Sequence, residues 1–142
     1  MKKKKRNNRQ NGTSIRNKKA SEMIMRIASG YIAMGDSIDK KQSNLNLACT
    51  AWNISLLPVG KRINKINDYI DSVRRVNSGI SEEDYNGILC NLKILINDKL
   101  KYYPNVNRRM LGAKIIIIDG KEHVTVLSID LDQIRNLTTA CS

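Results

Sequence analysis

The arrangement of apolar and polar positions predicts four helices, because apolar residues recur every three or four positions over most of the chain. The first helix is expected from Ala20, with Gly35 closing it as a left-handed cap. The second is expected between Ser37, a residue typical of helix N-caps, and Pro58. Its stripe of small and apolar residues predicts that this second helix is the central helix of the fold. The stripe is Leu45, Ala48, Cys49, Trp52 and Leu56.

The third and fourth helices follow the break at Pro58 and Gly60. The third has a narrow apolar stripe among charged residues, which is typical of a surface helix. That stripe is Ile63, Ile66, Ile70 and Val73. The fourth is expected after Ser81, an N-cap followed by three acids in the first turn, where the helix dipole favours negative charge. It has the longest apolar stripe of the chain and is expected to end at Pro104.

Alternating apolar residues near the C-terminus predict two strands, 113–118 and 122–127. Asp119 and Gly120 lie between them and are typical of a tight hairpin turn, with a loop of either two or four residues. Either loop places one set of side chains on the same face, namely Ala113, Ile115, Ile117, Val124 and Val126. Ile116 and Ile118 then lie on the other face. A short final helix capped by Asp130 is compatible with residues 130–137.

Residues 1–20 differ from the rest of the chain in charge and in apolar content. They contain nine lysines and arginines and no acid, because the first acid of the chain is Glu22, and Ile15 stands alone among polar residues. Such a segment cannot bury enough apolar surface to offset the entropy of ordering, so we predict a disordered cationic arm. Residues 21–142 contain thirteen acids against sixteen lysines and arginines. They are predicted to form a single α+β domain of four main helices and a C-terminal hairpin.

The arm favours a polyanion as partner, and its Asn and Gln residues can hydrogen-bond sugar and phosphate groups. A purely solubilising role is the plain alternative. Tyr102 and Tyr103 are adjacent at the end of the fourth helix. One of the two rings should face outward among basic residues, where it could stack on a base. The predicted nucleic-acid contacts are Lys2, Lys3, Lys4, Lys5, Arg6, Arg9, Arg16, Lys18, Lys19, Lys101, Arg108 and Arg109. Lys99 is expected on the same basic rim. Membrane binding is disfavoured, because no acyl signal and no apolar stripe accompany the cations.

Residues that could carry catalysis or hold a metal are few. His123 is the only histidine, and its strand position predicts a half-exposed side chain opposite Val124 and Val126. The three cysteines lack metal-ligand or disulfide spacing. Cys49 and Cys90 are expected in the core, whereas Cys141 is expected to be exposed. No phosphate-binding loop motif is present. We therefore predict a cytoplasmic protein without catalytic activity, cofactor or metal.

Two segments of the chain resemble a known pattern. One is the run Ala48–Pro58, which contains Ala51-Trp52-Asn53, and the other is the break at Tyr103-Pro104-Asn105. In these segments the chain resembles an uncharacterised family of small bacterial α+β proteins. In that family an AWN-like helix end and a proline precede a long helix, an aromatic-proline break and a terminal hairpin. The similarity spans residues 25–128 and implies no activity.

The sequence favours a non-catalytic accessory protein that binds RNA or DNA phosphates through its arm. The alternative is a protein-interaction subunit of a bacterial complex of the defence or toxin–antitoxin type, with the arm contacting an acidic protein. A homodimer is also expected, because a two-stranded hairpin can hide the run Ile115–Ile118 on one side only.

Overall fold

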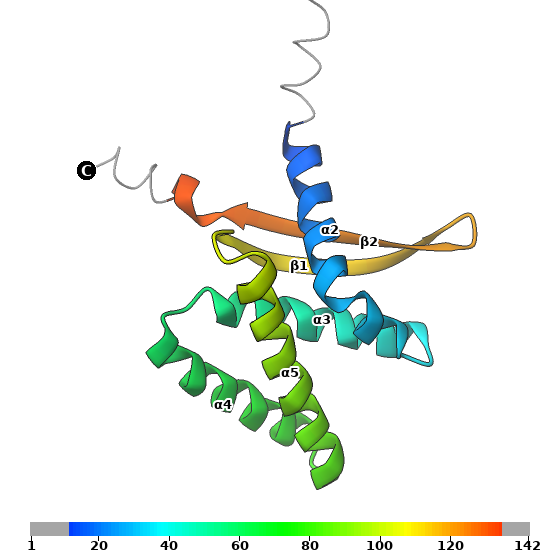
Figure 1. Ribbon diagram of the computed structural model, residues 1–142. Helices are drawn as coiled ribbons and strands as arrows, with labels where there is room; N and C mark the ends of the chain where they lie inside the picture. The colour runs from blue at the N-terminus through cyan, green and yellow to red at the C-terminus, as the bar shows by residue number, and fades with distance from the viewer. Residues whose placement is uncertain (1–11, 135–142) are drawn as a thin grey trace, which may run out of the picture.

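The computed structural model describes the backbone of residues 12–134 and the side chains from Lys19 onward, and the remaining residues lie outside this description (Figure 1). Four helices precede an antiparallel hairpin, as the sequence predicts. The elements are α2 (Gly12–Ala33), α3 (Ile38–Ser55), α4 (Val59–Val76), α5 (Glu82–Tyr102), β1 (Arg108–Ile118) and β2 (Lys121–Asp130).

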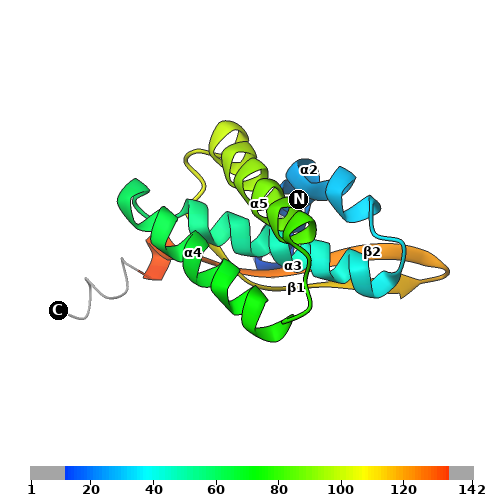
Figure 2. The same ribbon diagram turned by 90° about the horizontal axis from the view of Figure 1, so that it is seen from below.

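Helix α3 is the central helix, since it contacts α2, α4, α5 and β1. Figure 2 shows α2 and α5 on one side of α3 and α4 on the other. The core lies where α2, α3, α5 and the inner face of the hairpin meet. Of the predicted central stripe, Leu45, Ala48, Cys49 and Trp52 are buried and Leu56 is half-buried.

Trp52 is the largest fully buried side chain. Its indole Nε1 donates a hydrogen bond of 2.7 Å to the carbonyl oxygen of Arg108 at the start of β1. Its ring packs against that of Tyr103, with ring centroids 5.8 Å apart. Trp52 therefore joins α3, the end of α5 and the hairpin, as its place on the apolar stripe of the predicted central helix indicates.

Both predicted serine caps are confirmed. The Ser37 Oγ accepts a hydrogen bond from the backbone N–H of Lys40 at 3.2 Å, and the Ser81 Oγ accepts one from that of Asp84 at 3.1 Å. The turn after β2 is capped as expected, because the Asp130 carboxylate accepts from the N–H of Asp132 at 2.9 Å. The part of that final helix beyond residue 134 lies outside the described residues.

The start of the first helix and the role of Gly35 differ from the predictions. Helix α2 begins at Gly12, so residues 12–19, assigned to the arm, are helical. Once a helix is nucleated by packing at Ala20 and beyond, each further residue gains a hydrogen bond without the cost of a new nucleus. Gly35 does not have a positive φ, because in the described part of the chain only Asp119 and Gly120 do. Glycine is needed there for space, since a Cβ would lie 2.7 Å from the backbone nitrogen of Lys41.

The hairpin has the two-residue loop, with Ile118 paired to Lys121. Asp119 and Gly120 have φ values of 52° and 75°, as a type I′ turn requires. Both strands are longer than predicted, because pairing extends to Arg108 and Asp130, past a bulge between Met110 and Gly112. Of the predicted inner face, only Ile117 is exposed, at 62 %. The tip of the hairpin projects beyond the helices that cover the rest of this face (Figure 1).

Two amide side chains of α3, Gln42 and Asn53, hydrogen-bond the outer edge of β1, and we call them the edge amides. The Gln42 amide donates to the carbonyl oxygen of Ala113 at 3.0 Å and accepts from the N–H of Ile115 at 2.9 Å. The Asn53 amide donates to the carbonyl oxygen of Met110 and accepts from its N–H, both at 2.8 Å. Helix α3 thus supplies the hydrogen bonds that a third strand would otherwise make.

Candidate nucleic-acid interface

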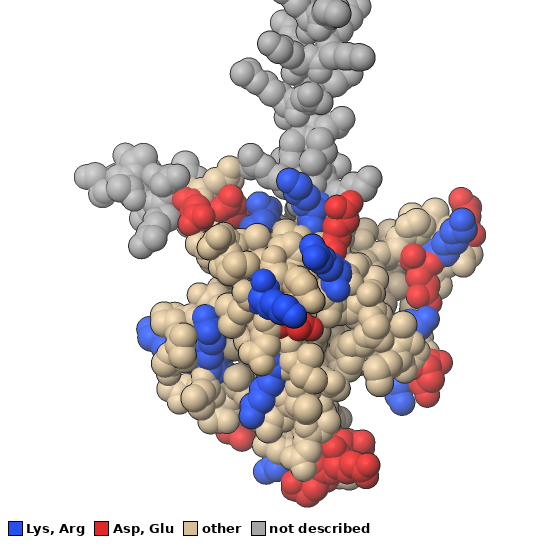
Figure 3. All heavy atoms as spheres, viewed as in Figure 1, with Lys and Arg blue, Asp and Glu red and all other residues tan. Residues whose placement is uncertain are grey.

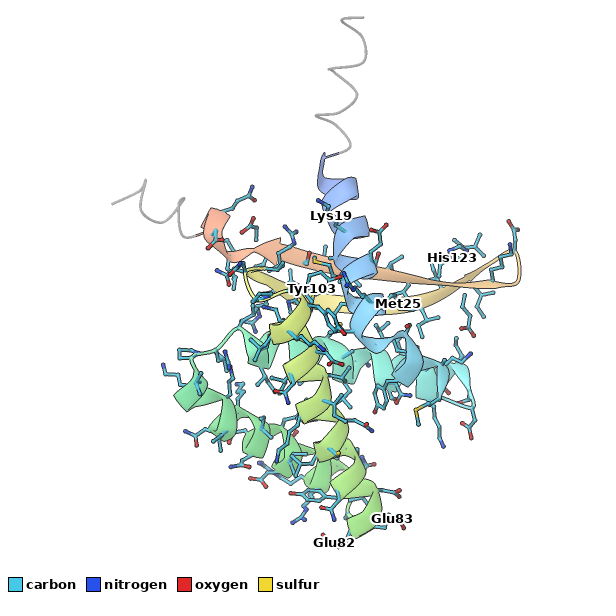
Figure 4. All side chains as sticks on the ribbon, in the orientation of Figure 1. Lys19, Met25, Glu82, Glu83, Tyr103 and His123 are labelled. Atoms are coloured by element: carbon cyan, nitrogen blue, oxygen red, sulfur yellow. The ribbon has the colours of Figure 1, made fainter. Side chains whose placement is uncertain are left out.

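Most of the predicted contact residues belong to the N-terminal segment. Lys2, Lys3, Lys4, Lys5, Arg6 and Arg9 lie outside the described residues. Arg16 and Lys18 belong to α2, but their side chains also lie outside the description. Lys19 is exposed on α2 (Figure 4). The basic segment therefore leads into a helix that packs on the core.

Tyr102, the last residue of α5, lies between two cations. Its side chain is 44 % exposed. The guanidinium carbon of Arg26, from α2, lies 4.9 Å from the ring centroid, and the Nζ of Lys101 lies 5.2 Å from it. Both distances are within the range of cation–π attraction. We call Tyr102, Lys101 and Arg26 the Tyr102 cluster.

The position of Tyr102 follows from that of its neighbour Tyr103. Successive helical residues point about 100° apart, so one tyrosine can face the core only if the other faces away. Tyr103 packs on Trp52 and faces α2 (Figure 4), with its ring centroid 5.7 Å from the guanidinium carbon of Arg26. The expectation that one ring completes the apolar stripe and the other points outward is confirmed.

The Tyr102 cluster is connected to the basic segment through one face of α2. Arg26 follows Lys19 by seven residues, which places the two side chains on the same side of the helix, two turns apart. Both are exposed. Figure 3 shows lysine and arginine side chains on this side of the molecule, below the grey residues, with acidic side chains next to them. Glu22 is the only acid in α2.

Arg108 and Arg109 do not join this cluster. The Nε and Nη2 of Arg108 donate to the Ser128 hydroxyl at 3.1 and 3.0 Å, and its Nη1 lies 4.0 Å from a carboxylate oxygen of Asp130. With a side chain only 15 % exposed, Arg108 links the two strands. Arg109 is exposed but lines a cavity of about 550 Å³ between α3 and α4. Lys65, Asp68 and Tyr69 also line that cavity, whereas no histidine or cysteine does.

The candidate nucleophiles occupy different environments. Burial raises the pKa of the Cys49 thiol to about 11, so this thiol is protonated and poorly nucleophilic at neutral pH. Cys90 is exposed, and the prediction that it packs in the core is wrong. It lies two residues before the buried Leu92, which turns it to the opposite side of α5. His123 is exposed on the outer hairpin face, paired with Ile116.

Two further cations were misjudged from the sequence. Arg26 was not predicted, because its contact with Tyr102 joins two helices far apart in the chain. Lys99, expected on the basic rim, is only 2 % exposed. Its Nζ donates to the carbonyl oxygen of Val106 at 3.0 Å and lies 5.2 Å from the centroid of the Trp52 ring. A signal for this burial exists in the sequence, since Lys99 follows Leu95 by four positions on the apolar stripe.

Neither metal ligands nor membrane spans are found within residues 12–134. No three His, Cys, Asp or Glu side chains come together there as a metal site. None of the described helices combines the length and the hydropathy needed to cross a bilayer. Comparison with known proteins finds no matching family model, curated protein or solved structure.

Proposed function

We propose that the protein is a cytoplasmic, non-catalytic accessory protein that binds nucleic acid through its basic N-terminal segment and the Tyr102 cluster. The observation that carries the proposal is the position of Arg26, which lies beside Tyr102 and on the same face of α2 as Lys19. A nucleic-acid strand held by the cations of residues 2–19 would follow this face to an exposed aromatic ring. Cations supply affinity for phosphates, and the ring supplies a surface for a base.

The Tyr102 cluster favours single-stranded over double-stranded nucleic acid. A base can stack on an exposed ring only if it is not already stacked in a duplex. Arg26 and Lys101 lie against the Tyr102 ring, so a stacking base would displace one of them toward a flanking phosphate. The cluster contains no group that reads base edges in a fixed geometry, so we expect little sequence preference.

Replacing Tyr102 by Ala is expected to weaken binding to a short unstructured RNA by roughly 5-fold to 100-fold, the loss typical of one base–aromatic stack. Tyr85→Ala is the matched control, because the guanidinium carbon of Arg74 lies 3.8 Å from the Tyr85 ring centroid in a similar pair elsewhere on α5. Fluorescence anisotropy at physiological salt measures both affinities. Equal affinities for the two variants would remove the Tyr102 cluster from the proposal.

The outer hairpin face favours a second candidate function, a protein-interaction subunit whose basic segment contacts an acidic protein. Ile116, Ile118 and Leu127 are exposed on this face, and exposed apolar patches often mark protein contacts. The two candidates differ in a simple test. A complex isolated from native cells should dissociate on nuclease treatment if nucleic acid is the partner, and it should survive if an acidic protein is.

A second copy of the chain is the occupant that we propose for the outer hairpin face. Ile116→Lys places a charge in the middle of that face, so it should convert a dimer at micromolar concentration to a monomer. Asn67→Lys, a charge added at an exposed position of α4 away from the hairpin, controls for net charge. Sedimentation velocity measures the state. A wild-type protein that sediments as a monomer throughout this concentration range would contradict the dimer.

A further inference from the structure

Lys99 and Arg62 line one small cavity at the C-terminal end of α3. The cavity has a volume of about 230 Å³ and lies between the end of α3, the last turns of α5 and the link at 104–107. Lys99 comes from α5 and Arg62 from α4. Two cations from different helices therefore meet at a space large enough for several water molecules, since one water occupies roughly 30 Å³ in the liquid.

The hydrogen bonds of these two cations leave donors unused. An ammonium group has three N–H donors, and the Lys99 Nζ makes one hydrogen bond, to the carbonyl oxygen of Val106. The Arg62 Nε donates to the carbonyl oxygen of Leu57 at 2.9 Å, and its Nη2 donates to that of Ser55 at 3.0 Å. Among the described residues, the Arg62 Nη1 and the other two N–H groups of Lys99 have no hydrogen-bond acceptor.

The charge of the pair is not neutralised by the cavity lining, which contains no Asp or Glu. Asp132 does not line the cavity, although it accepts a hydrogen bond from the amide of Asn107, which does. Backbone carbonyl oxygens at the helix end supply only partial negative charge. Burial lowers the pKa of Lys99, and the neighbouring Arg62 lowers it further. A buried cation next to a second cation is unfavourable unless an anion compensates it.

We infer that this cavity is a binding site for a tetrahedral oxyanion of the phosphate type, held by Lys99 and Arg62. The Nη1 of the guanidinium offers its unused N–H groups to phosphate oxygens, and the Lys99 ammonium offers a point charge and two further donors. The same chemistry could come from free phosphate or from the terminal phosphate of a nucleic acid. This site is separate from the Tyr102 cluster, so the inference does not depend on the proposed function.

Trp52 supplies the readout, because it is the only tryptophan and its ring lies 5.2 Å from the Lys99 Nζ. We would titrate the full-length protein with inorganic phosphate at constant ionic strength, replacing chloride, and follow Trp52 fluorescence together with calorimetric heat. A saturable change is expected. Arg62→Gln should weaken phosphate binding roughly tenfold to a hundredfold, the effect of a lost charge-assisted hydrogen bond.

Lys99→Met should abolish the saturable response without unfolding the domain, because an apolar side chain of similar length commonly replaces a buried charge at little cost. Lys93→Met, at an exposed position of the same helix, is the matched control and should respond like the wild type. A signal no different from that of chloride, or one that survives in Lys99→Met, would overturn the inference and leave a cavity that holds water only.

Two oligonucleotides, used as competitors, distinguish the two sources of phosphate. A short oligonucleotide with a 5′-phosphate should compete with inorganic phosphate if the site takes a nucleic-acid end, whereas the same oligonucleotide with a 5′-hydroxyl should not. If neither oligonucleotide competes while inorganic phosphate still binds, the site is assigned to the free ion. Deleting residues 2–11 should leave the inorganic phosphate response unchanged, so failure of arm binding and failure of this site are distinguishable.

Discussion

Deleting residues 2–11 is expected to remove most of the salt dependence of nucleic-acid binding. The deletion removes six cations, Lys2, Lys3, Lys4, Lys5, Arg6 and Arg9. Each phosphate contact contributes about −0.9 to the slope of log affinity against log salt on duplex DNA, and about −0.7 on single strands. If all six cations bind phosphates, the slope on duplex should fall in magnitude by about 5. Affinities for duplex DNA and unstructured RNA, measured from low to physiological salt, give this slope directly.

The structure determines where this deletion should end. Helix α2 begins at Gly12, so a longer deletion to residue 19 would remove two turns of a helix that packs on the core. The shorter variant should keep the far-ultraviolet circular dichroism and melting temperature of the full chain. A full-length variant with glutamine at the six positions controls for chain length and should match the deletion. An unchanged slope in both variants would exclude arm-driven binding and favour an acidic protein partner.

Replacing Trp52 by Ala is expected to cost about 3 to 5 kcal/mol of unfolding free energy, as is typical for a buried aromatic side chain. The ring is fully buried, packs on Tyr103, and lies beside the Nζ of Lys99. Its removal also leaves the Arg108 carbonyl oxygen without its indole donor. Small domains have only about 5 to 15 kcal/mol of stability, so the variant should be largely destabilised. Urea denaturation followed by circular dichroism measures the loss.

Trp52→Phe keeps one aromatic ring in the core and loses the indole N–H together with the smaller ring. The unsatisfied acceptor alone should cost about 1 to 3 kcal/mol, and the lost ring atoms add to this cost. Emission from Trp52 in the native wild-type protein should be that of a shielded indole and should shift to longer wavelength on unfolding. Solvent-exposed emission before unfolding, or a loss below 1 kcal/mol in Trp52→Ala, would contradict the burial.

The elements predicted correctly depend on chemistry that is local in the sequence. Ser37 and Ser81 cap the helices that follow them, and Asp119-Gly120 forms the turn that its two residues favour. The apolar spacing around Trp52 identified the central helix because periodicity reports which side of a helix faces the core. In each case the physical cause lies within a few residues.

The features that were missed depend on partners far away in the chain. Gln42 and Asn53 look like solvent-facing helix residues in the sequence, because nothing in an amide shows that a strand edge lies opposite it. Arg26 meets Tyr102 only when α2 packs against α5. Lys99 was assigned to the surface on account of its charge, although its position on the apolar stripe turned it inward. The candidate site was therefore only partly predictable, since the contact of Arg26 with Tyr102 exists only in the tertiary fold.

The edge amides have a consequence for how far a sheet built from several copies could grow. Gln42 and Asn53 already bond β1 at Met110, Ala113 and Ile115, so a strand could add along this stretch only by displacing these amides. If two copies were to pair through β2, each outer edge of the resulting sheet would be a β1 partly covered by the edge amides. Adding a third molecule would have to displace these amides, which opposes the extension of a chain with four consecutive isoleucines into a cross-β fibre.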